Sequence, residues 1–399
     1  MPSANYRSLL RTPGAAAFFL PASLGRVGIA MTGLGMVWLV HSRTGTFATA
    51  GLVSGAFAVA DALGAPQLAR FVDRFGQTRV LPPTLLVHAS AAALLVTLVV
   101  ADAADGWLVL GGALVGASVP QLGAMSAARW SAALRSGGRA AELPTAFALE
   151  SISNAVGYLV GPMAVSALAG AGHPLAGTVL AASLSVGGGA LLAAHRASAP
   201  APVAADAESA LGRRLLPRGP LLLLLGLSLG VGVFFGALQV SVPAFVVEHG
   251  APGAAAPVLA VSNGCGLVAG WLYGLRRPTT APGVQLMAAT GVLTFGGALL
   301  LAVGSPLELG FALVLTGVVI PPLLVLFPLL AESFVHRAVL TEAFAWLGSA
   351  SAAGSAAAVA FSGWAIDSAG ARGGFAVAVT AAGAMALQSA AGLRLLRVP

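Results

Sequence analysis

Long apolar runs recur along this chain and are separated by short polar segments. A run of about 20 apolar residues is long enough to cross the hydrocarbon core of a bilayer as a helix. Such runs are found at 15–40, 47–69, 80–101, 107–129, 144–169, 175–195, 220–247, 254–275, 283–303, 307–330, 342–366 and 374–394. A hydrophobic share of 58% excludes an ordinary soluble domain. We therefore predict an all-α membrane protein with twelve transmembrane helices.

The segment 70–79 holds three arginines and one aspartate, although charged residues make up only 8% of the chain. It lies between two apolar runs and is too polar for hydrocarbon, so we expect a short loop outside the membrane. Gly76 is expected to make the reversal, because glycine reaches positive φ without a Cβ clash. Basic residues collect in cytoplasmic loops, which places this loop on the cytoplasmic side.

The other arginines test this orientation. With the N-terminus inside, seventeen of the twenty fall on the cytoplasmic side, with Arg129 counted at a helix end. Only Arg43 and Arg372 fall outside, and Arg26 lies within a span. This bias predicts an integral protein of the cytoplasmic membrane with both termini in the cytoplasm. The net charge of +7 is spread singly over short loops, so no nucleic-acid partner is expected.

The segment 196–219 is rich in proline and alanine and lacks apolar periodicity, which predicts a cytoplasmic linker. It separates residues 1–195 from residues 220–399, and each part holds six of the expected spans. We interpret the two parts as an N-terminal and a C-terminal six-helix bundle.

The two parts repeat short motifs in matching spans. Thr145-Ala-Phe-Ala is matched by Glu342-Ala-Phe-Ala, Ser23-Leu-Gly by Ser228-Leu-Gly, and Pro120 by Pro321. The offsets are 197, 205 and 201 positions, which are close to one shared period and indicate duplication. Duplicated halves predict two pseudo-symmetric bundles around a shared site near the bilayer midplane.

The motif Asp73-Arg74-Phe75-Gly76, with Arg79 downstream, resembles the loop between spans 2 and 3 in the major facilitator superfamily. Together with the six-plus-six arrangement, this likeness covers the whole chain and implies a transporter that works by alternating access. Ala69 stands where that motif has its leading glycine, and Gln77-Thr78 replaces its basic pair.

The resemblance gives these loop residues a role in conformational gating. It implies that Asp73 anchors the loop at the start of span 11, which here reads Thr341-Glu342. Such a helix start is positive and attracts a carboxylate.

Gly157, Gly161 and Pro162 resemble a span 5 motif of the drug:proton antiporter branch of that family. The resemblance implies helix packing that seals the two halves during gating. The glycine pair that normally follows is replaced by Val165 and Ser166.

The span 4 arginine that serves proton coupling in many relatives is missing, because Pro120-Gln121 occupies that stretch. Arg129 lies too near the span end to replace it.

Four polar residues inside spans are the candidates for proton coupling: Arg26, Asp61, Glu150 and Asn154. A charged residue at a helix centre costs roughly 2.5–3.5 kcal/mol, so each needs a reason. We expect Arg26 to pair with Glu150 or Asp61, and we favour Glu150 as the proton carrier because Asn154 follows one turn later. A static ion pair, or a Glu150 that reaches the interface, remains the alternative.

The candidates for substrate contact are Gln121, Gln239, Asn263 and Trp346, although hydrogen bonding between helices is an alternative for the three amides. The sequence contains no metal-ligand cluster, phosphate-binding loop or catalytic triad. It therefore predicts no enzyme activity, no cofactor and no metal.

Two functions follow from these features. The favoured one is proton-coupled export of a small, largely hydrophobic compound by a monomer in the lipid bilayer. The alternative is uptake or facilitated exchange of a small polar or anionic metabolite, with Arg26 binding the anionic group. A receptor or scaffold without transport is disfavoured, because no soluble signalling domain is present.

Overall fold

All regular secondary structure in the described part of the chain is helical. The computed structural model describes residues 6–201, 218–251, 254–276 and 280–394. The helices are α1 (Tyr6–Leu10), α2 (Ala15–Thr44), α3 (Phe47–Phe75), α4 (Gln77–Val100), α5 (Asp105–Ala117), α6 (Leu122–Ser136), α7 (Leu143–Gly170), α8 (Pro174–Ala194), α10 (Arg218–Glu248), α11 (Ala255–Leu275), α12 (Pro282–Leu300), α13 (Pro306–Phe334), α14 (Leu340–Ala369) and α15 (Ala371–Ala391). Within these ranges, twelve segments are long and apolar enough to cross a membrane, with α5 and α6 forming one of them. The predicted number of spans is confirmed.

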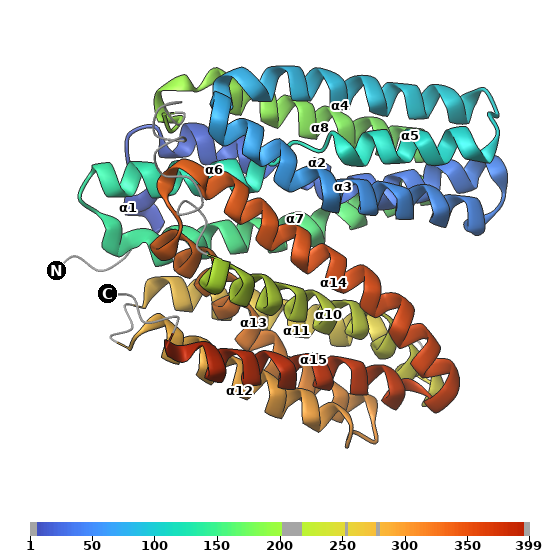
Figure 1. The fold of residues 1–399 in the computed structure, drawn as a ribbon. Helices are drawn as coiled ribbons and strands as arrows, with labels where there is room; N and C mark the ends of the chain where they lie inside the picture. The colour runs from blue at the N-terminus through green and yellow to red at the C-terminus, as the bar shows by residue number, and fades with distance from the viewer. Residues whose placement is uncertain (1–5, 202–217, 252–253, 277–279, 395–399) are drawn as a thin grey trace.

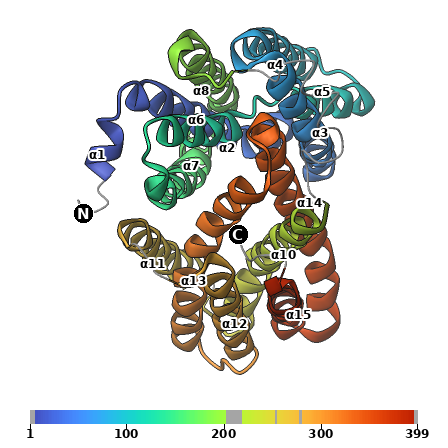
Figure 2. The ribbon, with the colours of Figure 1, turned by 60° about the vertical axis from the view of Figure 1, so that its left-hand side comes forward.

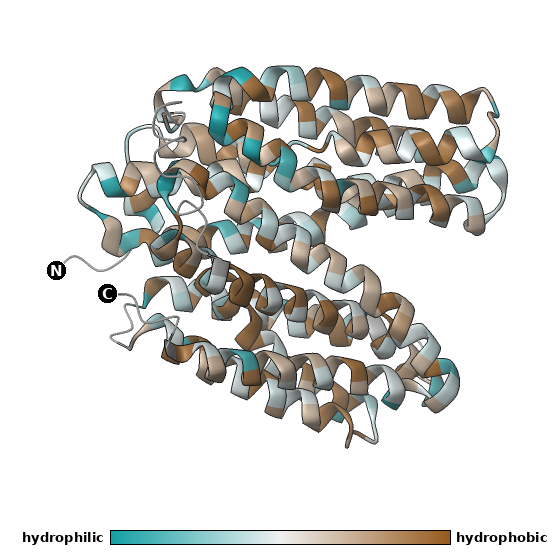
Figure 3. Cartoon of the chain, in the orientation of Figure 1, coloured by the Kyte–Doolittle hydropathy of each residue, from teal (hydrophilic) through white to brown (hydrophobic). Residues whose placement is uncertain are grey.

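The helices form two groups, α2–α8 and α10–α15, called here the first half and the second half (Figure 1, Figure 2). Helix α1 and the last turn of α15 lie at the same end of the molecule, called here the terminus end (Figure 1). Hydrophobic residues follow the lengths of the helices, and many of the strongly hydrophilic ones gather at the terminus end (Figure 3). This distribution fits helices that lie side by side across a bilayer.

The segment 70–79 is not the loop that its charge predicted. Helix α3 continues to Phe75 and α4 starts at Gln77, so Gly76 alone separates them. Ala69 and Val72 are 0% and 1% exposed, and this buried helix face explains why α3 continues past the apolar run. Gly76 has φ of 89°, which confirms its predicted positive φ.

The fourth span is broken, whereas the sequence predicted one continuous helix over 107–129. Helix α5 ends at Ala117 and α6 begins at Leu122. Pro120 explains the break, because proline lacks an N–H and its ring disfavours helical geometry in the residue before it. His88 on α4 approaches this break, with its Nδ1 atom 3.3 Å from Ser118 Oγ.

Arg129 is a buried residue within a helix and not the helix-end arginine that the charge count assumed. Helix α6 continues to Ser136, and Arg129 is 0% exposed. Its guanidinium donates to Gln77 Oε1 (2.7 Å), to the carbonyl oxygens of His195 (2.8 Å) and Leu192 (3.1 Å), and to Ser198 Oγ (2.8 Å). It therefore attaches the end of α8 and the start of the expected linker to α4 and α6.

Of the expected linker 196–219, positions 202–217 lie outside the described residues. Arg196–Ser198 form a short 3₁₀ turn, and α10 already begins at Arg218.

Glycines bring particular helix pairs into direct backbone contact. In the first half, a methyl group at Gly28 would collide with the carbonyl oxygen of Ala181, so α2 lies against α8. In the second half, a methyl group at Gly232 would collide with the carbonyl oxygen of Ser351, so α10 lies against α14. Close approach at small residues is the usual basis of helix association in lipid.

The α10–α14 contact gives a stability prediction. Gly232→Ala should lower the unfolding temperature of the purified protein, because overpacking costs about 1–3 kcal/mol. Gly291→Ala on α12 is the matched control, since no atom lies within 4 Å of its added methyl group. Alanine is also the better helix former by about 1 kcal/mol. An equal effect of both substitutions on thermal unfolding in detergent would contradict the packing described here.

Candidate functional site

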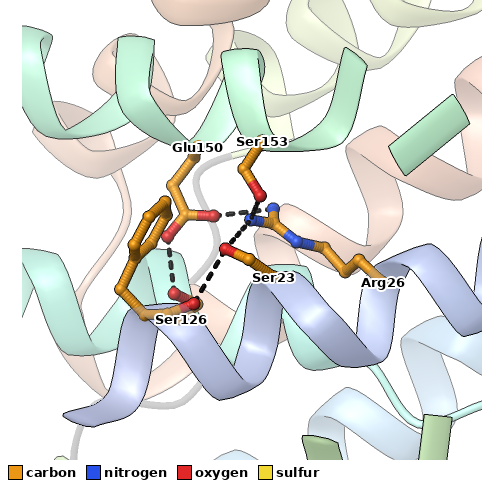
Figure 4. Close-up of polar contacts among 6 residues, drawn as sticks. Ser23, Arg26, Ser126, Glu150 and Ser153 are labelled. Carbon is orange, nitrogen blue, oxygen red and sulfur yellow. Dashed lines mark hydrogen bonds and ion pairs between the residues drawn. The ribbon is translucent and has the colours of Figure 1, made fainter. Parts of the chain in front are cut away.

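Arg26 lies in the middle of α2, next to the helix face that packs on α8. Gly25 and Gly28 form that packed face. The Arg26 side chain points from α2 toward α7 (Figure 4). It is 10% exposed, so its charge must be satisfied within the protein.

Arg26 forms an ion pair with Glu150 of α7, one of the two carboxylates that the sequence analysis expected as its partner. The Arg26 Nη1 and Glu150 Oε2 atoms are 2.7 Å apart, and each side chain is 10% exposed. Arg26 Nη2 also donates to Ser153 Oγ at 2.8 Å and to Ser23 Oγ at 3.4 Å (Figure 4). A buried ion pair is tolerated only when its remaining hydrogen-bonding groups also find partners, and the serines provide them.

Glu150 receives its hydrogen bond from Ser126 of α6 and not from Asn154. Ser126 Oγ donates to Glu150 Oε1 at 2.5 Å (Figure 4). Asn154 is exposed, and the structure gives it no hydrogen bond to Glu150. The spacing of one turn correctly put the two residues near each other along α7, but the partner comes from another helix. Nothing in the sequence distinguishes Ser126 from its many small neighbours.

Asp61 of α3 is half-buried and belongs to a different contact. Gln121 Nε2 lies 3.5 Å from Asp61 Oδ1 and donates to the carbonyl oxygen of Val119 at 3.1 Å. Gln121 therefore links the second carboxylate to the break between α5 and α6. Arg26 is paired with Glu150, and the structure gives no ion pair between Arg26 and Asp61.

The other expected substrate contacts are exposed and lie on separate helices of the second half. Gln239 lies on α10 and Asn263 lies on α11. Trp346 lies on α14, six residues after its start, and donates Nε1–H to Glu342 Oε1 at 3.4 Å.

Gly157 and Gly161 face α2 within the first half. A Cβ atom at Gly161 would lie 3.1 Å from the carbonyl oxygen of Val27 and 3.1 Å from Met31 Cγ. At Gly157 it would lie 3.7 Å from the Val27 nitrogen. The expected flat packing strip is therefore present, but it supports α2 next to Arg26, whereas the resemblance implied a seal between the halves. Pro162 lies within α7 at the same level.

The two halves are joined by polar contacts at the terminus end. Asp73 Oδ2 accepts from the Glu342 backbone nitrogen at 2.8 Å, which confirms the expected contact with the start of α14. Arg135 of α6 forms a two-pronged ion pair with Glu332 of α13, whose side chain is 2% exposed. Ser131 Oγ donates to the same carboxylate at 2.9 Å. These contacts can hold the terminus end closed.

Two further contacts join the second half to the N-terminal part of the chain through aromatic residues. The Tyr6 hydroxyl donates to the Trp271 carbonyl oxygen at 2.9 Å, and burial raises the pKa of Tyr6 to about 12, so it remains a neutral donor. The rings of Phe147 and Phe344 meet edge to face at 5.9 Å. These two phenylalanines occupy matching positions in the internal repeat, as expected for residues near a pseudo-two-fold axis.

Arg74 and Arg79 are exposed, as the loop motif suggested. The Arg74 guanidinium lies over the Phe75 ring at 5.4 Å from its centroid. Gln77, which replaces a basic residue of the family motif, is buried and accepts from Arg129.

Comparisons with known proteins agree with this geometry. A profile of the Major Facilitator Superfamily matches residues 18–339. The fold is similar to a bacterial homologue of the iron transporter ferroportin in an outward-facing state, with a TM-score of 0.74, 13% identity, and coverage of 94% of this chain and 98% of the other. It is also similar to the human organic anion transporter MFSD10 (TETRAN), with a TM-score of 0.67, 17% identity and coverage of 94% and 98%.

A third similar structure is the transporter FucP in its outward conformation, with a TM-score of 0.68, 13% identity and coverage of 94% and 99%. No curated protein sequence matches the chain. At these identities, the solved structures support the fold and leave the substrate open.

The Asp73 contact predicts how the terminus end opens. Asp73→Asn should weaken closure by about 1 kcal/mol, because the amide oxygen can still accept from Glu342 but no longer carries a charge, and hydrogen bonds to charged groups are stronger than neutral ones. Ala132 and Asp73 line the same small cavity. A cysteine at Ala132, in a Cys265→Ala background, should therefore react faster with a maleimide in the Asp73→Asn variant.

Glu308→Gln is the matched control for this experiment. Glu308 accepts from the Gly304 backbone nitrogen at 2.7 Å at the start of α13, away from the terminus end. This substitution should leave the labelling rate unchanged. Equal rates in the parent and in Asp73→Asn would show that the contact does not control closure.

Proposed function

The chain belongs to the major facilitator superfamily of secondary transporters, and on that premise we propose that Glu150 and Arg26 couple its transport to protons. The observation that carries the proposal is the 2.7 Å ion pair between these side chains, each 10% exposed, within the membrane-spanning part of the first half. Ionisable residues in such positions commonly form substrate or proton pathways.

The pair responds to protonation through simple electrostatics. An ionised Glu150 holds the Arg26 guanidinium, because opposite charges attract strongly where water is scarce. A proton on Glu150 removes that attraction and frees Arg26 for another partner. Arg26 lies on α2 and Glu150 lies on α7. Alternation between the held and the freed guanidinium can therefore change how these two helices pack against each other. Asp61 and Asn154 are the secondary candidates for this role.

We propose that the terminus end faces the cytoplasm. Arg135, Arg139, Arg196 and Arg276 lie at this end, and basic residues favour the cytoplasmic side. In this orientation both termini are cytoplasmic, and the Asp73 and Glu332 contacts close the cytoplasmic entrance. We also propose that the protein acts as a monomer in the cytoplasmic membrane.

The first candidate direction is export of a small, largely hydrophobic compound. The Gly157, Gly161 and Pro162 motif, which resembles the drug:proton antiporter branch, supports it. Gln121, Gln239, Asn263 and Trp346 are the proposed substrate contacts, and none of them carries a charge. A compound that meets few charges must be bound mostly through apolar surface.

The second candidate is uptake or facilitated exchange of a small polar or anionic metabolite. Arg26 favours it, because its Nε–H is buried without an acceptor in the described structure. The similar structures include one of a human organic anion transporter and one of a fucose:proton symporter, FucP of E. coli.

Glu150→Gln tests the coupling. This substitution should reduce pH-gradient-driven transport in proteoliposomes to the level seen without a gradient, while substrate binding stays measurable. Arg26→Ala should impair both the gradient-driven transport and the substrate binding, because it leaves Glu150 as an unpaired buried charge. Asp61→Asn is the comparison variant and should retain coupled transport. Proton-driven accumulation or expulsion by Glu150→Gln would transfer the carrier role to Asp61.

Gly161→Leu tests the α2–α7 packing. Leucine should push α7 away from Val27 and disturb the neighbouring Arg26, so coupled transport should fall while membrane insertion persists. Gly170→Leu, at the end of the same helix, is the control, since a Cβ there meets nothing within 4 Å. Parent-like transport by Gly161→Leu would mean that the motif match is coincidental.

A further inference from the structure

A groove runs along the second half between α14 and α15, with α10 as its floor. The three helices contact one another, and α10 lies between the other two on the side turned to the viewer in Figure 1. The groove has a volume of about 450 Å³, which falls within the range of about 300–1,000 Å³ for small-molecule sites. Its lining includes Gly226, Leu229, Phe361, Thr380, Ala384 and Gln388.

The groove opens to the outside of the helix bundle. Leu229 on its floor is 45% exposed, and Phe361 at its edge is 67% exposed. All three helices are candidate membrane spans, so these apolar side chains lie at the level of the bilayer. Helix α14 contacts α3 and lies between the groove and the first half (Figure 1). The groove is therefore separated from the space between the two halves.

The path of α14 relative to α15 creates this groove. The two helices meet at the end opposite the terminus end, where a methyl group at Gly373 would collide with the Ala365 carbonyl oxygen. From there they separate toward the terminus end, and α10 becomes visible between them (Figure 1). The groove is thus widest on the side of the terminus end.

The length of the groove matches one leaflet of a bilayer. Along α15 its lining extends from Ala376 to Gln388, a step of twelve positions and so roughly 18 Å. The hydrocarbon core of a bilayer is about 30 Å thick, so one leaflet contributes about 15 Å. Gln388 lies three positions before the last residue of α15, Ala391, at the terminus end. The groove therefore begins near the membrane surface and continues into the hydrocarbon.

Two polar side chains line this apolar groove, and one of them lacks a partner. Thr380 Oγ1 donates to the Ala376 carbonyl oxygen at 2.8 Å and is satisfied. The Gln388 amide lies against α10, since a Cβ atom at Gly226 would be 3.0 Å from both its Nε2 and its Oε1 atoms. Among the described residues, this amide has no hydrogen-bond partner. A polar group in an apolar environment is unfavourable unless a hydrogen bond satisfies it.

A lipid acyl chain fits both features. Its ester group lies at the membrane surface, at the level of Gln388, and its hydrocarbon extends inward along Leu229 and Phe361. A transported compound would instead have to reach the space between the halves, from which α14 separates the groove.

We propose that this groove binds one acyl chain of a membrane glycerophospholipid, and that the ester carbonyl of this chain accepts from Gln388 Nε2–H. The site is distinct from the Arg26–Glu150 pair and goes beyond the proposed function.

A pair of ester and ether lipids tests the hydrogen bond. The probes are palmitoyl-oleoyl phosphatidylglycerol and the diether lipid with the same headgroup and chain lengths, titrated onto the delipidated full-length protein in detergent. Native mass spectrometry measures the affinity for the first bound lipid. The ester lipid should bind about three- to tenfold more tightly, because the ether lacks the carbonyl acceptor. Gln388→Leu should bind both lipids equally, at the affinity of the parent for the ether.

Ala384→Phe tests the position of the acyl chain. Ala384 is exposed and lines the groove, so a phenyl ring there should fill it. A phosphatidylglycerol with a diazirine in one acyl chain should label peptides that contain 226–233 or 376–388 in the parent. Ala384→Phe should lose most of this labelling. Ala288→Phe on α12 is the matched control, since Ala288 is also exposed but does not line the groove, and it should keep the labelling.

Equal affinity of the parent for the two lipids, or labelling that persists in Ala384→Phe, would overturn the site. A dimer in the native mass spectra that Ala384→Phe dissociates would assign the groove to a second copy of the chain and would also overturn it. Both measurements are made without transport, so their outcome is independent of the Glu150→Gln result.

Discussion

The cost of an unsatisfied polar group in hydrocarbon governs this structure. Three buried charged side chains meet that constraint in three ways. Arg26 is paired with a carboxylate, Arg129 is surrounded by neutral acceptors that include two carbonyl oxygens, and Glu332 joins the halves through Arg135. Each solution ties together segments that are distant in the sequence, so the charges determine which helices meet. The apolar surface alone would leave many helix arrangements close in energy, because lipid is as apolar as the helices.

Close packing is distributed differently in the two halves, despite the internal repeat. Glycines bring α2 against α8 in the first half, but they bring α10 against α14 in the second half. By order along the chain, α8 is the sixth span and α14 is the eleventh. The repeat therefore predicts which helices correspond, and it correctly relates Phe147 to Phe344, but it does not predict the tightest neighbours. A glycine allows close packing only with the helix that lies against it, and the helix in that position differs between the halves.

Hydropathy predicted the twelve spans, the missing Cβ of Gly76 predicted its positive φ, and the buried charge of Arg26 predicted a carboxylate partner, Glu150 or Asp61, of which the structure has Glu150. Each of these follows from a rule that concerns a single residue or a single span. The partners of Arg129 could not be predicted, because they include main-chain carbonyl groups that every residue possesses. Ser126 could not be distinguished from other small residues. Asn154 was assigned to Glu150 from spacing along one helix, whereas the hydrogen bond comes from a neighbouring helix.

The charge of the compound that meets Arg26 determines the sign of proton coupling. An anion at Arg26 and the ionised carboxylate of Glu150 compete for the same guanidinium, so a proton on Glu150 favours the anion, and the anion favours the proton. This linkage is reciprocal by thermodynamic necessity. Ligands that favour each other's binding cross the membrane together, which describes symport. A neutral or cationic compound gains no binding energy from the freed Arg26. Coupled export requires that the compound and the proton compete for binding. The charge of the bound compound therefore decides between the two candidate directions, through the same pair of residues.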